Sequence, residues 1–327
     1  MTGSGRAAAG RIRAALRRRA EGPYAALDRI EARLDTLGPR FEALGARLNA
    51  LGGRLDALTG ELDLLRTDLG GTLLAIAADE PANRRRLAEV RAEGDYRLAW
   101  EEREPLVSVT VATVGRPELT GRSLPSILAQ THTNLEVIVA GDGTPPETEA
   151  AVAELADARV RYLDLGPRQS PTDDPARDWL VGATRPRNAT IAAATGRWIV
   201  EFDDDDSLRP NCVEALLELA RETRAEAVYG QVRQHGGGDP IDFCEFPPRL
   251  GHFSWAAAMY HRGLGFFGRQ ELAADLGLPG DWWLAERMLR AGVRFAMREE
   301  VLCDAYASGR EQTAREEGRI PWADSGA

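Results

Sequence analysis

A heptad repeat of large apolar residues near the N-terminus limits the fold of this 327-residue chain more than any other feature. From Leu27 to Leu69, apolar residues recur at alternating spacings of three and four, as the a and d positions of successive heptads do. A 3.5-residue period keeps a narrow apolar stripe facing a partner helix over a long distance. The alternative, an amphipathic helix packed on its own domain, would show a wider stripe and rarely persists this long. The repeat therefore predicts a coiled-coil arm.

The residues at the edges of this stripe indicate how a partner helix would be oriented. The e positions hold Gly38, Gly45 and Gly52, and the g positions hold Arg33, Arg40, Arg47 and Arg54. An antiparallel partner would set Arg against Arg, whereas a parallel partner would place the arginines opposite neutral glycines. The glycines weaken the isolated helix, and Pro39 should kink or interrupt it. We therefore expect a homo-oligomer through the coiled coil, a parallel dimer or trimer.

The composition changes at several points along the chain. Gly70 and Gly71 interrupt the heptads, and the segment 80–83 should break the helix before a second, polar helix that runs to about Glu104. We expect four parts: a basic tail at 1–20, a helical arm and connector at 21–104, a catalytic domain at 105–310 and a polar tail at 311–327.

The formal net charge of -10 conceals a basic N-terminus, because residues 1–20 carry six Arg and no acid. The rest of the chain is therefore strongly acidic, which argues against nucleic acid as a partner. The basic tail could contact anionic lipid at a membrane surface or remain a solvated, frayed terminus. Only Ile12 and Leu16 offer it apolar anchoring, which favours the solvated terminus.

Neither a membrane span nor a disulfide framework is expected. No segment approaches about 18 consecutive apolar residues, and the N-terminus lacks an apolar signal-peptide core. The three cysteines are widely spaced and odd in number, which fits neither disulfide pairing nor a zinc site. We expect a soluble, cytoplasmic protein, with the inner face of the membrane as an alternative location.

After Pro105 the pattern changes to short apolar runs separated by helical segments, which is typical of an α/β domain. A doubly wound sheet binds ligands at the carboxyl ends of its strands, so the residues after each strand are the candidate site residues. Strands are expected at Val107–Ala112, Leu135–Ala140, Val160–Leu163, Trp198–Phe202 and Ala227–Val232. Helices are expected at about Pro117–Gln130, Glu147–Ala156, Arg187–Ala194 and Pro210–Arg221.

Two of these strand ends carry weak signals. The first strand runs into the segment from Thr113 to Arg116, and the second runs into Asp142 between two glycines. Both segments could line the mouth of the sheet. An ordinary turn after a strand explains each of them equally well.

The strand that begins at Trp198 ends in the strongest signal, four consecutive acids from Asp203 to Asp206. Packed carboxylates repel one another unless a cation holds them, and in an extended conformation Asp203 and Asp205 project to the same side. Such oxygen ligands suit Mg²⁺ or Mn²⁺ bridged to a diphosphate. The alternative is a solvated acidic turn in which Asp206 or Ser207 caps the next helix. The four acids come directly after a buried strand, and this position favours a metal site.

A fourth segment, GDWWLAERMLRAG, places Asp281 just before an amphipathic helix. Capping that helix would be a sufficient role for Asp281. Trp282 and Trp283 could stack against a sugar or a nucleotide, although core packing explains at least one of them equally well.

In this order, the four segments resemble those of the family 2 glycosyltransferases, inverting enzymes with the A-type, Rossmann-like nucleotide-sugar-binding fold. VSVTVATVGRPELT is similar to the family's opening strand motif, and SILAQTHTNLEVIVAGDGT is similar to its second strand. RPRNATIAAATGRWIVEFDDDD is similar to the segment that carries the DXD motif, and GDWWLAERMLRAG to the one that carries the catalytic base. The resemblance covers about residues 105–306.

The resemblance implies a role for each matching residue. Asp205 would ligate a divalent metal, Mn²⁺ or Mg²⁺, with Asp203 and Asp204 supporting the metal and the ribose. Asp281 would be the catalytic base, although Gly280 replaces the family's usual Glu, which bears on acceptor contacts. Further contacts to the nucleotide sugar would come from Thr113, Arg116, Asp142, Arg187 and Asn188.

The implied reaction is metal-dependent transfer of a sugar from a nucleotide-diphosphate sugar to a glycan, lipid-linked or other hydroxyl acceptor, with inversion. Two alternatives stay open. A nucleotidyltransferase shares a similar fold, although no Gly-rich phosphate loop with a basic residue follows the first strand. A non-catalytic coiled-coil scaffold could bind nucleotide sugar without turnover. Residues 233–267 should build much of the acceptor side, with His235, His252 and His261 as structural or surface residues.

Overall fold

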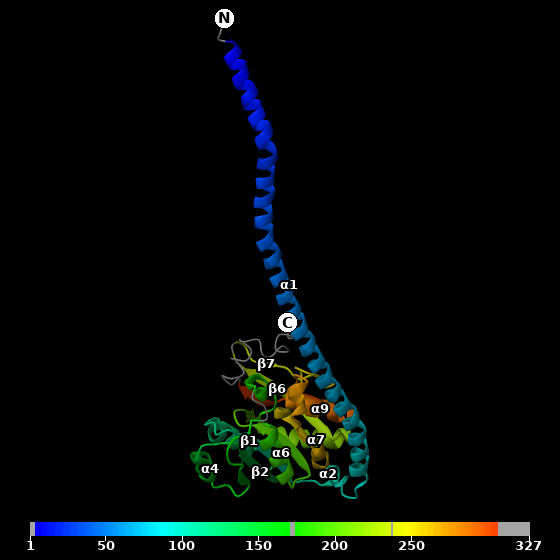
Figure 1. Ribbon diagram of the computed structural model, residues 1–327. Helices are drawn as coiled ribbons and strands as arrows, with labels where there is room; N and C mark the ends of the chain where they lie inside the picture. The colour runs from blue at the N-terminus through cyan, green and yellow to red at the C-terminus, as the bar shows by residue number, and fades with distance from the viewer. Residues whose placement is uncertain (1–3, 171–173, 237, 307–327) are drawn as a thin grey trace. The chain divides into compact units, whose positions relative to one another are not determined.

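The computed structural model describes residues 4–170, 174–236 and 238–306 (Figure 1). The chain divides into two compact units, Met1–Gly71 and Thr72–Ala327. The second unit contains the sheet and all of the helices other than the long N-terminal one. Among the described helices, none combines the length and the apolarity needed to span a bilayer.

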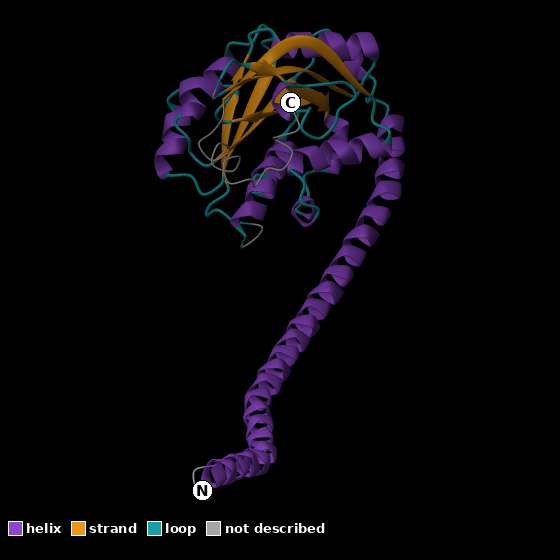
Figure 2. Cartoon of the chain, turned by 90° about the horizontal axis from the view of Figure 1, so that it is seen from above, coloured by secondary structure: helices purple, strands orange, loops and turns teal. Residues whose placement is uncertain are grey.

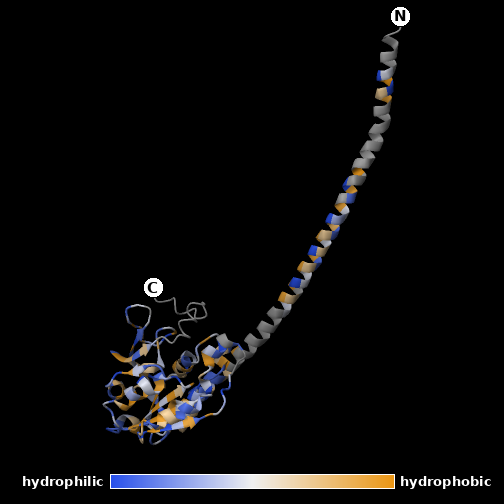
Figure 3. Cartoon of the chain, turned by 90° about the vertical axis from the view of Figure 1, so that its left-hand side faces the viewer, coloured by the Kyte–Doolittle hydropathy of each residue, from blue (hydrophilic) through white to orange (hydrophobic). Residues whose placement is uncertain are grey.

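The described part of the first unit consists of one helix, α1 (Ser4–Ala92), which continues into the second unit. Large apolar side chains of the heptad stripe from Ile30 to Leu58 are between 41% and 69% exposed in the single chain. Figure 3 shows apolar and polar bands alternating along this helix. The helix is not interrupted at Pro39, because helix propagation is cooperative and a few unfavourable residues do not offset the hydrogen bonds around them.

The last turns of α1 belong to the second unit, so the boundary lies at Gly71 rather than near residue 104. The break expected at 80–83 is also absent. Leu87 and Val90 are at most 2% exposed and pack in the main core. The Asn83 amide donates to Asp79 at 2.6 Å. Burial of one face therefore keeps this segment helical despite Pro81.

The sheet of the second unit contains the five expected strands, with ends within a few residues of those expected (Figure 2). Its order is β3-β2-β1-β4-β8-β6-β9-β5, and β7 pairs with β6. The first four strands are mutually parallel, and β8 is antiparallel to both of its neighbours. The strands are β1 (Val107–Thr113), β2 (Leu135–Gly141), β3 (Val160–Asp164), β4 (Trp198–Asp203), β5 (Ser207–Leu208), β6 (Ala227–His235), β7 (Ile241–Asp242), β8 (Ala258–His261) and β9 (Phe295–Tyr306).

Strands β8 and β9 were not expected from the sequence. β8 has only four residues, and charged residues interrupt the apolar pattern of β9. Both strands pair with β6, β8 antiparallel and β9 parallel, so contacts between distant segments decide their conformation.

Helices connect most of the strands. The helix expected at Pro117–Gln130 is instead a π-helical turn followed by a short helix, since Pro125 cannot donate a hydrogen bond to the preceding turn. The helices are α2 (Leu98–Glu101), η1 (Leu119–Ser123), α3 (Leu124–Leu128), α4 (Pro146–Ala153), α5 (Pro175–Val181), α6 (Thr184–Ala193), α7 (Cys212–Thr223), η2 (Trp255–Ala257), η3 (Arg262–Phe267), α8 (Leu272–Asp275) and α9 (Gly280–Ala291).

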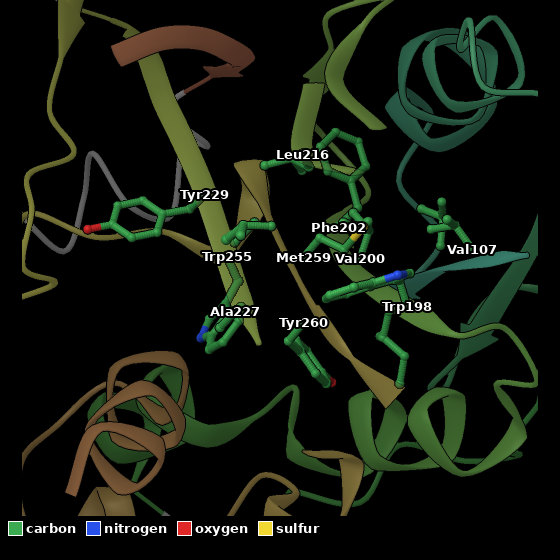
Figure 4. Close-up of a cluster of buried hydrophobic side chains, with 14 of the residues drawn as sticks. Val107, Trp198, Val200, Phe202, Leu216, Ala227, Tyr229, Trp255, Met259 and Tyr260 are labelled. Carbon is green, nitrogen blue, oxygen red and sulfur yellow. The ribbon is translucent and has the colours of Figure 1, made fainter. Parts of the chain in front are cut away.

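The core lies between the sheet and its helices and fixes the strand that carries the acids. Figure 4 shows Trp198, Val200 and Phe202 of β4 among the buried side chains of the neighbouring elements, and all three are fully buried. Every second residue of β4 is thus held in the core. The carboxyl end of β4 is therefore a fixed platform for the residues that follow it.

Candidate active site

The carboxyl ends of three parallel strands meet at one edge of the sheet. In the register of the sheet, Thr113 at the end of β1 lies opposite Gly141 of β2, and Ala112 lies opposite Asp203 of β4. The first three predicted motifs are therefore neighbours in space, as the parallel-sheet interpretation requires.

Two arginines hold the acids that follow β4. Arg187 pairs with Asp203, whereas Arg116 donates to Asp204 at 3.0 Å and also pairs with Asp205. β4 ends at Asp203, so the extended conformation on which the expected projection of Asp203 and Asp205 depended does not continue to Asp205. Asp204 and Asp205 instead share one guanidinium.

The fourth acid, Asp206, contacts the end of β9 rather than Arg116 or Arg187. It is buried, and its Oδ1 accepts a hydrogen bond from the Tyr306 backbone N–H at 2.9 Å. The residue at the N-cap of α7 is Asn211, so neither Asp206 nor Ser207 caps that helix. Asp206 therefore supports the fold around the turn, and the three preceding acids remain candidates for ligand binding.

Burial makes the negative charge at this turn costly. It is the largest cause that raises the pKa of Asp204, against the opposing effect of Arg116. Burial, together with the charge of Asp203, raises the pKa of Asp205 to about 6. A cation at this point would favour the ionised carboxylates.

Thr113 and Asp142 both lie at the strand ends and are almost fully buried. The Thr113 hydroxyl donates to Asp204 at 2.6 Å and accepts from the Gly115 N–H at 2.9 Å. Asp142 accepts a hydrogen bond from Arg185 at 2.7 Å. Sequence reasoning did not single out Arg185, although it stands two residues before Arg187 in the same motif.

Arg187 and Asn188 are adjacent in sequence but have different surroundings. Besides pairing with Asp203, Arg187 donates to the Phe202 carbonyl at 2.7 Å, which places it at the end of β4. The Asn188 amide donates to the Arg269 carbonyl at 2.9 Å and accepts from the Arg269 N–H at 2.7 Å. The structure therefore brings Arg187 to the acids, while Asn188 is occupied by the backbone of a distant loop.

Asp281 is the second residue of α9 rather than its cap, since Pro279 occupies the N-cap position. Its Oδ1 accepts from the Trp282 N–H at 2.6 Å. Burial raises the pKa of Asp281, with Arg269 opposing and Asp203 reinforcing the effect. The segment 267–270 links the two motifs: Arg287 of α9 donates to the Phe267 carbonyl, and the Arg269 N–H donates to Asn188, which follows Arg187 in the chain.

A buried ion pair behind the site was not predicted. Glu201 of β4 accepts from Arg269 at 2.7 Å and from the Tyr260 hydroxyl at 2.9 Å. Glu201 is 1% exposed. An acid inside the apolar segment before the DXD motif was the available signal, because a buried carboxylate requires a partner.

The remaining aromatic and histidine candidates are mainly structural. Trp283 is 2% exposed and packs in a core cluster, which confirms core packing for one of the two tryptophans. His235 bonds Asp304 at 2.7 Å, and His252 lies 3.1 Å from Glu245. His261 is buried among aromatic rings. The three cysteines are free and buried.

A family model described as glycosyl transferase family 2 matches residues 108–243. The chain contains a family 2 glycosyltransferase domain. The match includes the strand-end acids and Arg187 but ends before Asp281. The α/β architecture expected for this domain is confirmed by the sheet described above.

Curated relatives align with the domain over part of their length. The succinoglycan biosynthesis protein ExoO of Rhizobium meliloti is 34% identical over 38% of this chain and 32% of its own length. The Escherichia coli UDP-Glc:alpha-D-GlcNAc-diphosphoundecaprenol beta-1,3-glucosyltransferase WfgD is 26% identical over 38% of this chain and 45% of its own. This chain thus spans less than half the length of either relative.

Similarity to solved structures is lower. Staphylococcal TarS (S. aureus) aligns with a TM-score of 0.49 and 16% identity, covering 63% of this chain and 37% of that chain.

Proposed function

We propose that this protein is a glycosyltransferase that moves a sugar from a nucleotide-diphosphate sugar to an acceptor hydroxyl with inversion. The observation that supports it most directly is the arrangement at the carboxyl ends of β1 and β4, where Thr113, Arg116 and Arg187 contact the acids from Asp203 to Asp205. Asp281 is assigned as the base from its place at the start of α9, which the segment 267–270 links to Asn188. One carboxylate can act as base while the others face the donor. The family 2 domain supports the same reaction class.

The reaction is a single in-line displacement. Asp281 accepts the proton of the acceptor hydroxyl as its oxygen forms a bond to the anomeric carbon. The bond to the diphosphate oxygen breaks on the opposite face, and its electron pair leaves with the nucleoside diphosphate. The raised pKa of Asp281 makes it a stronger base than an exposed aspartate. No covalent intermediate is needed, because the phosphates already activate the leaving group.

The nucleotide side of the donor is assigned to the ends of β1 and β2. Thr113 and Asp142 lie there in fixed positions, held by hydrogen bonds to Asp204 and Arg185. Arg116 and Arg187 supply positive charge beside the acids, where a diphosphate would lie. Asn188 supports this site indirectly by holding Arg269.

The acids after β4 fit a divalent metal shared with the substrate. Within the described residues, no three His, Cys, Asp or Glu side chains form a metal-binding group of their own. Mg²⁺ and Mn²⁺ sites of nucleotide enzymes use one or two carboxylates and complete their coordination with phosphate oxygens. Asp205, with Asp203, would hold such an ion. Bound there, the metal would neutralise charge on the leaving diphosphate.

Substitutions at two neighbouring acids test the metal assignment. We expect Asp205→Ala to remove Mn²⁺-dependent binding of nucleoside diphosphate while the fold is retained, because the change relieves repulsion among crowded carboxylates. Asp206→Asn is the matched control: it weakens the bond to Tyr306, so it should lower the melting temperature and leave nucleotide affinity intact. Calorimetric titration with and without Mn²⁺ measures both, and unchanged affinity in Asp205→Ala would refute the assignment.

The relatives suggest the substrate class. Their names refer to succinoglycan biosynthesis and to glucosyl transfer from UDP-glucose onto a diphosphoundecaprenol-linked sugar. We therefore assign this chain a role in glycan assembly, with a UDP-sugar donor and a lipid-linked acceptor as the first candidates. A cytoplasmic location, at the inner face of the membrane, follows from that assignment.

The arm and the tail have proposed roles of their own. The exposed heptad stripe of α1 supports a homo-oligomer through a parallel coiled coil. Ile12 and Leu16 are exposed one helical turn apart in the arginine-rich tail. Peripheral contact with anionic lipid through them is the alternative to a solvated terminus.

Thermal-shift measurements with UDP, GDP, CDP and dTDP, each with Mn²⁺, identify the nucleotide. Release of that nucleoside diphosphate from its sugar conjugates then tests turnover, and the anomeric configuration of the product tests inversion. A scaffold would bind the nucleotide without release. A nucleotidyltransferase would instead form sugar nucleotide from nucleoside triphosphate, and either result would replace the proposed reaction.

A further inference from the structure

The last turns of α1 reach the helix that carries Asp281. Asp79 of α1 accepts a hydrogen bond from Arg287 of α9 at 2.8 Å, and the Arg287 side chain is only 4% exposed. Asn83, one turn further along α1, donates to the same carboxylate at 2.6 Å. Burial by itself would raise the pKa of Asp79, but Arg287, together with the hydrogen bonds from Gln270 and Asn83, outweighs burial and lowers it. Asp79 is therefore a charged partner of a buried arginine.

Arg287 ties this contact to a loop beside the site. Its Nη1 donates to the carbonyl oxygens of Phe267 and Gly268, at 2.6 and 3.0 Å. Gln270 then accepts from the indole N–H of Trp283 at 2.9 Å and lies 3.3 Å from Asp79. Asp79 and α9 are thus joined twice to the segment 267–270.

Arg269, in the middle of that segment, connects it to the base. Glu201 holds its guanidinium, Asn188 holds its backbone, and its positive charge acts on Asp281. Asp79 and Arg269 also line one pocket of about 720 Å³. The chain of contacts from Asp79 therefore ends at the electrostatic partner of Asp281.

We propose that Asp79 is a positioning residue for the catalytic base: through Arg287 it fixes the first turns of α9, which carry Asp281, and the segment 267–270, which carries Arg269. This inference rests on the proposed transferase function. It assigns a role in the active site to α1, which lies before residue 108, where the family match begins.

A second buried ion pair on α1 provides a matched control. Arg91 donates to both carboxylate oxygens of Glu226 at 2.6 Å, and the Glu226 side chain is fully buried. Glu226 immediately precedes β6, and none of its hydrogen bonds described here involves the segment 267–270. Asp79→Asn and Glu226→Gln each neutralise one acid without changing its size. Both should lower the melting temperature, because each leaves an arginine with a weaker partner.

Turnover separates the two variants. The assay uses the full chain and the donor that the thermal-shift and release measurements identify. We expect Asp79→Asn to lower kcat for nucleoside-diphosphate release by about 10- to 100-fold, because small misplacements of catalytic groups have effects of this size. Its KM for donor should stay within about twofold, because the donor binds at the ends of β1 and β2. Glu226→Gln, assayed well below its melting temperature, should retain the wild-type kcat. Equal kcat values in the two variants would overturn the proposal.

A spectroscopic measurement decides the question without turnover. With 5-fluorotryptophan incorporated, the ¹⁹F resonances of Trp282 and Trp283 report on the first turn of α9, and Trp→Phe substitutions assign them. These resonances should shift or broaden in Asp79→Asn and stay in place in Glu226→Gln. If the wild-type chain releases no nucleoside diphosphate, the proposed function fails, while unshifted resonances in Asp79→Asn would still overturn the positioning role by itself.

Discussion

In the proposed mechanism Asp281 has a chemical task and a structural one, and substitutions can separate the two. Its carboxylate accepts the Trp282 N–H at 2.6 Å, and we propose that it also takes the proton of the acceptor hydroxyl. A residue near a helix N-terminus often has only the structural task. The two tasks respond differently to replacement by Asn and by Ala.

We expect Asp281→Asn to lower the transfer rate by about 10²- to 10⁴-fold, since an amide cannot accept the proton of the acceptor hydroxyl. Donor affinity and melting temperature should change little, because the Asn oxygen can still accept from Trp282. Asp281→Ala should lose the rate and also some stability, roughly 1 kcal/mol. Transfer assays, calorimetry and thermal melting compare the variants, and an active Asn variant would remove Asp281 from the mechanism.

His261 gives a prediction for stability against pH. It is buried between the aromatic rings of Trp100 and Trp198, and burial lowers its pKa to about 4. The folded protein keeps this histidine neutral, whereas the unfolded chain takes up a proton below pH 6.5, so stability is lost as the pH falls from 6.5 towards 4. The full effect is roughly 3 kcal/mol.

Urea unfolding of the wild type and of His261→Gln between pH 7 and pH 5 measures this effect. Glutamine can replace both ring contacts, to the Tyr96 carbonyl and the Gly263 N–H, without titrating. The stability difference between the two proteins should change with pH in this window. Parallel curves would show that His261 has no part in the acid sensitivity of the fold.

At the scale of elements, α1 has two different environments along its length. Up to Gly71 the described apolar side chains of the heptad stripe are mostly exposed, whereas Leu87 and Val90 are buried in the second unit. The polypeptide just after α1 continues this packing, with Tyr96 and Trp100 against His261. The last turns of the helix are therefore part of the domain that contains the site.

This division predicts where the chain can be shortened. A chain that starts at Thr72 should fold and release nucleoside diphosphate, while one that starts at Glu101 should not fold. The shorter chain loses four large buried side chains, and each such loss costs about 2 to 5 kcal/mol against a total stability of about 5 to 15 kcal/mol. Circular dichroism melting compares the two, and a cooperative transition in the chain from Glu101 would contradict the assigned boundary.

For the whole molecule, the oligomeric state depends on the apolar heptad stripe of α1. A row of large apolar side chains at heptad spacing is unfavourable in water unless a partner covers it. In the described chain, residues such as Phe41 and Leu55 are 69% and 66% exposed. A second copy of the same helix offers the matching surface.

We expect light scattering to show that the full chain is a dimer or trimer and that the chain from Thr72 is a monomer. As a control, Leu44→Asp with Leu51→Asp places charge at two d positions and should give a monomer that still releases nucleoside diphosphate. A monomeric full chain would rule out the coiled coil.

The sequence by itself determined the features that rest on local patterns. Heptad spacing predicts the long helix, apolar runs predict β1, β2 and β4, and the residues after those strands predict most of the site. Parallel strands bring such residues together whatever the details of the packing. The family 2 match covers these same segments.

Only the tertiary structure decided which partners the site residues have. Several of these contacts join residues that lie far apart in the chain. Asp204 and Asp205 share Arg116, Asn188 holds Arg269, and Asp79 contacts α9. Residue spacing does not encode such contacts, because they depend on how helices and loops dock on the sheet. The same docking keeps α1 helical past Pro81 and makes its end part of the catalytic domain.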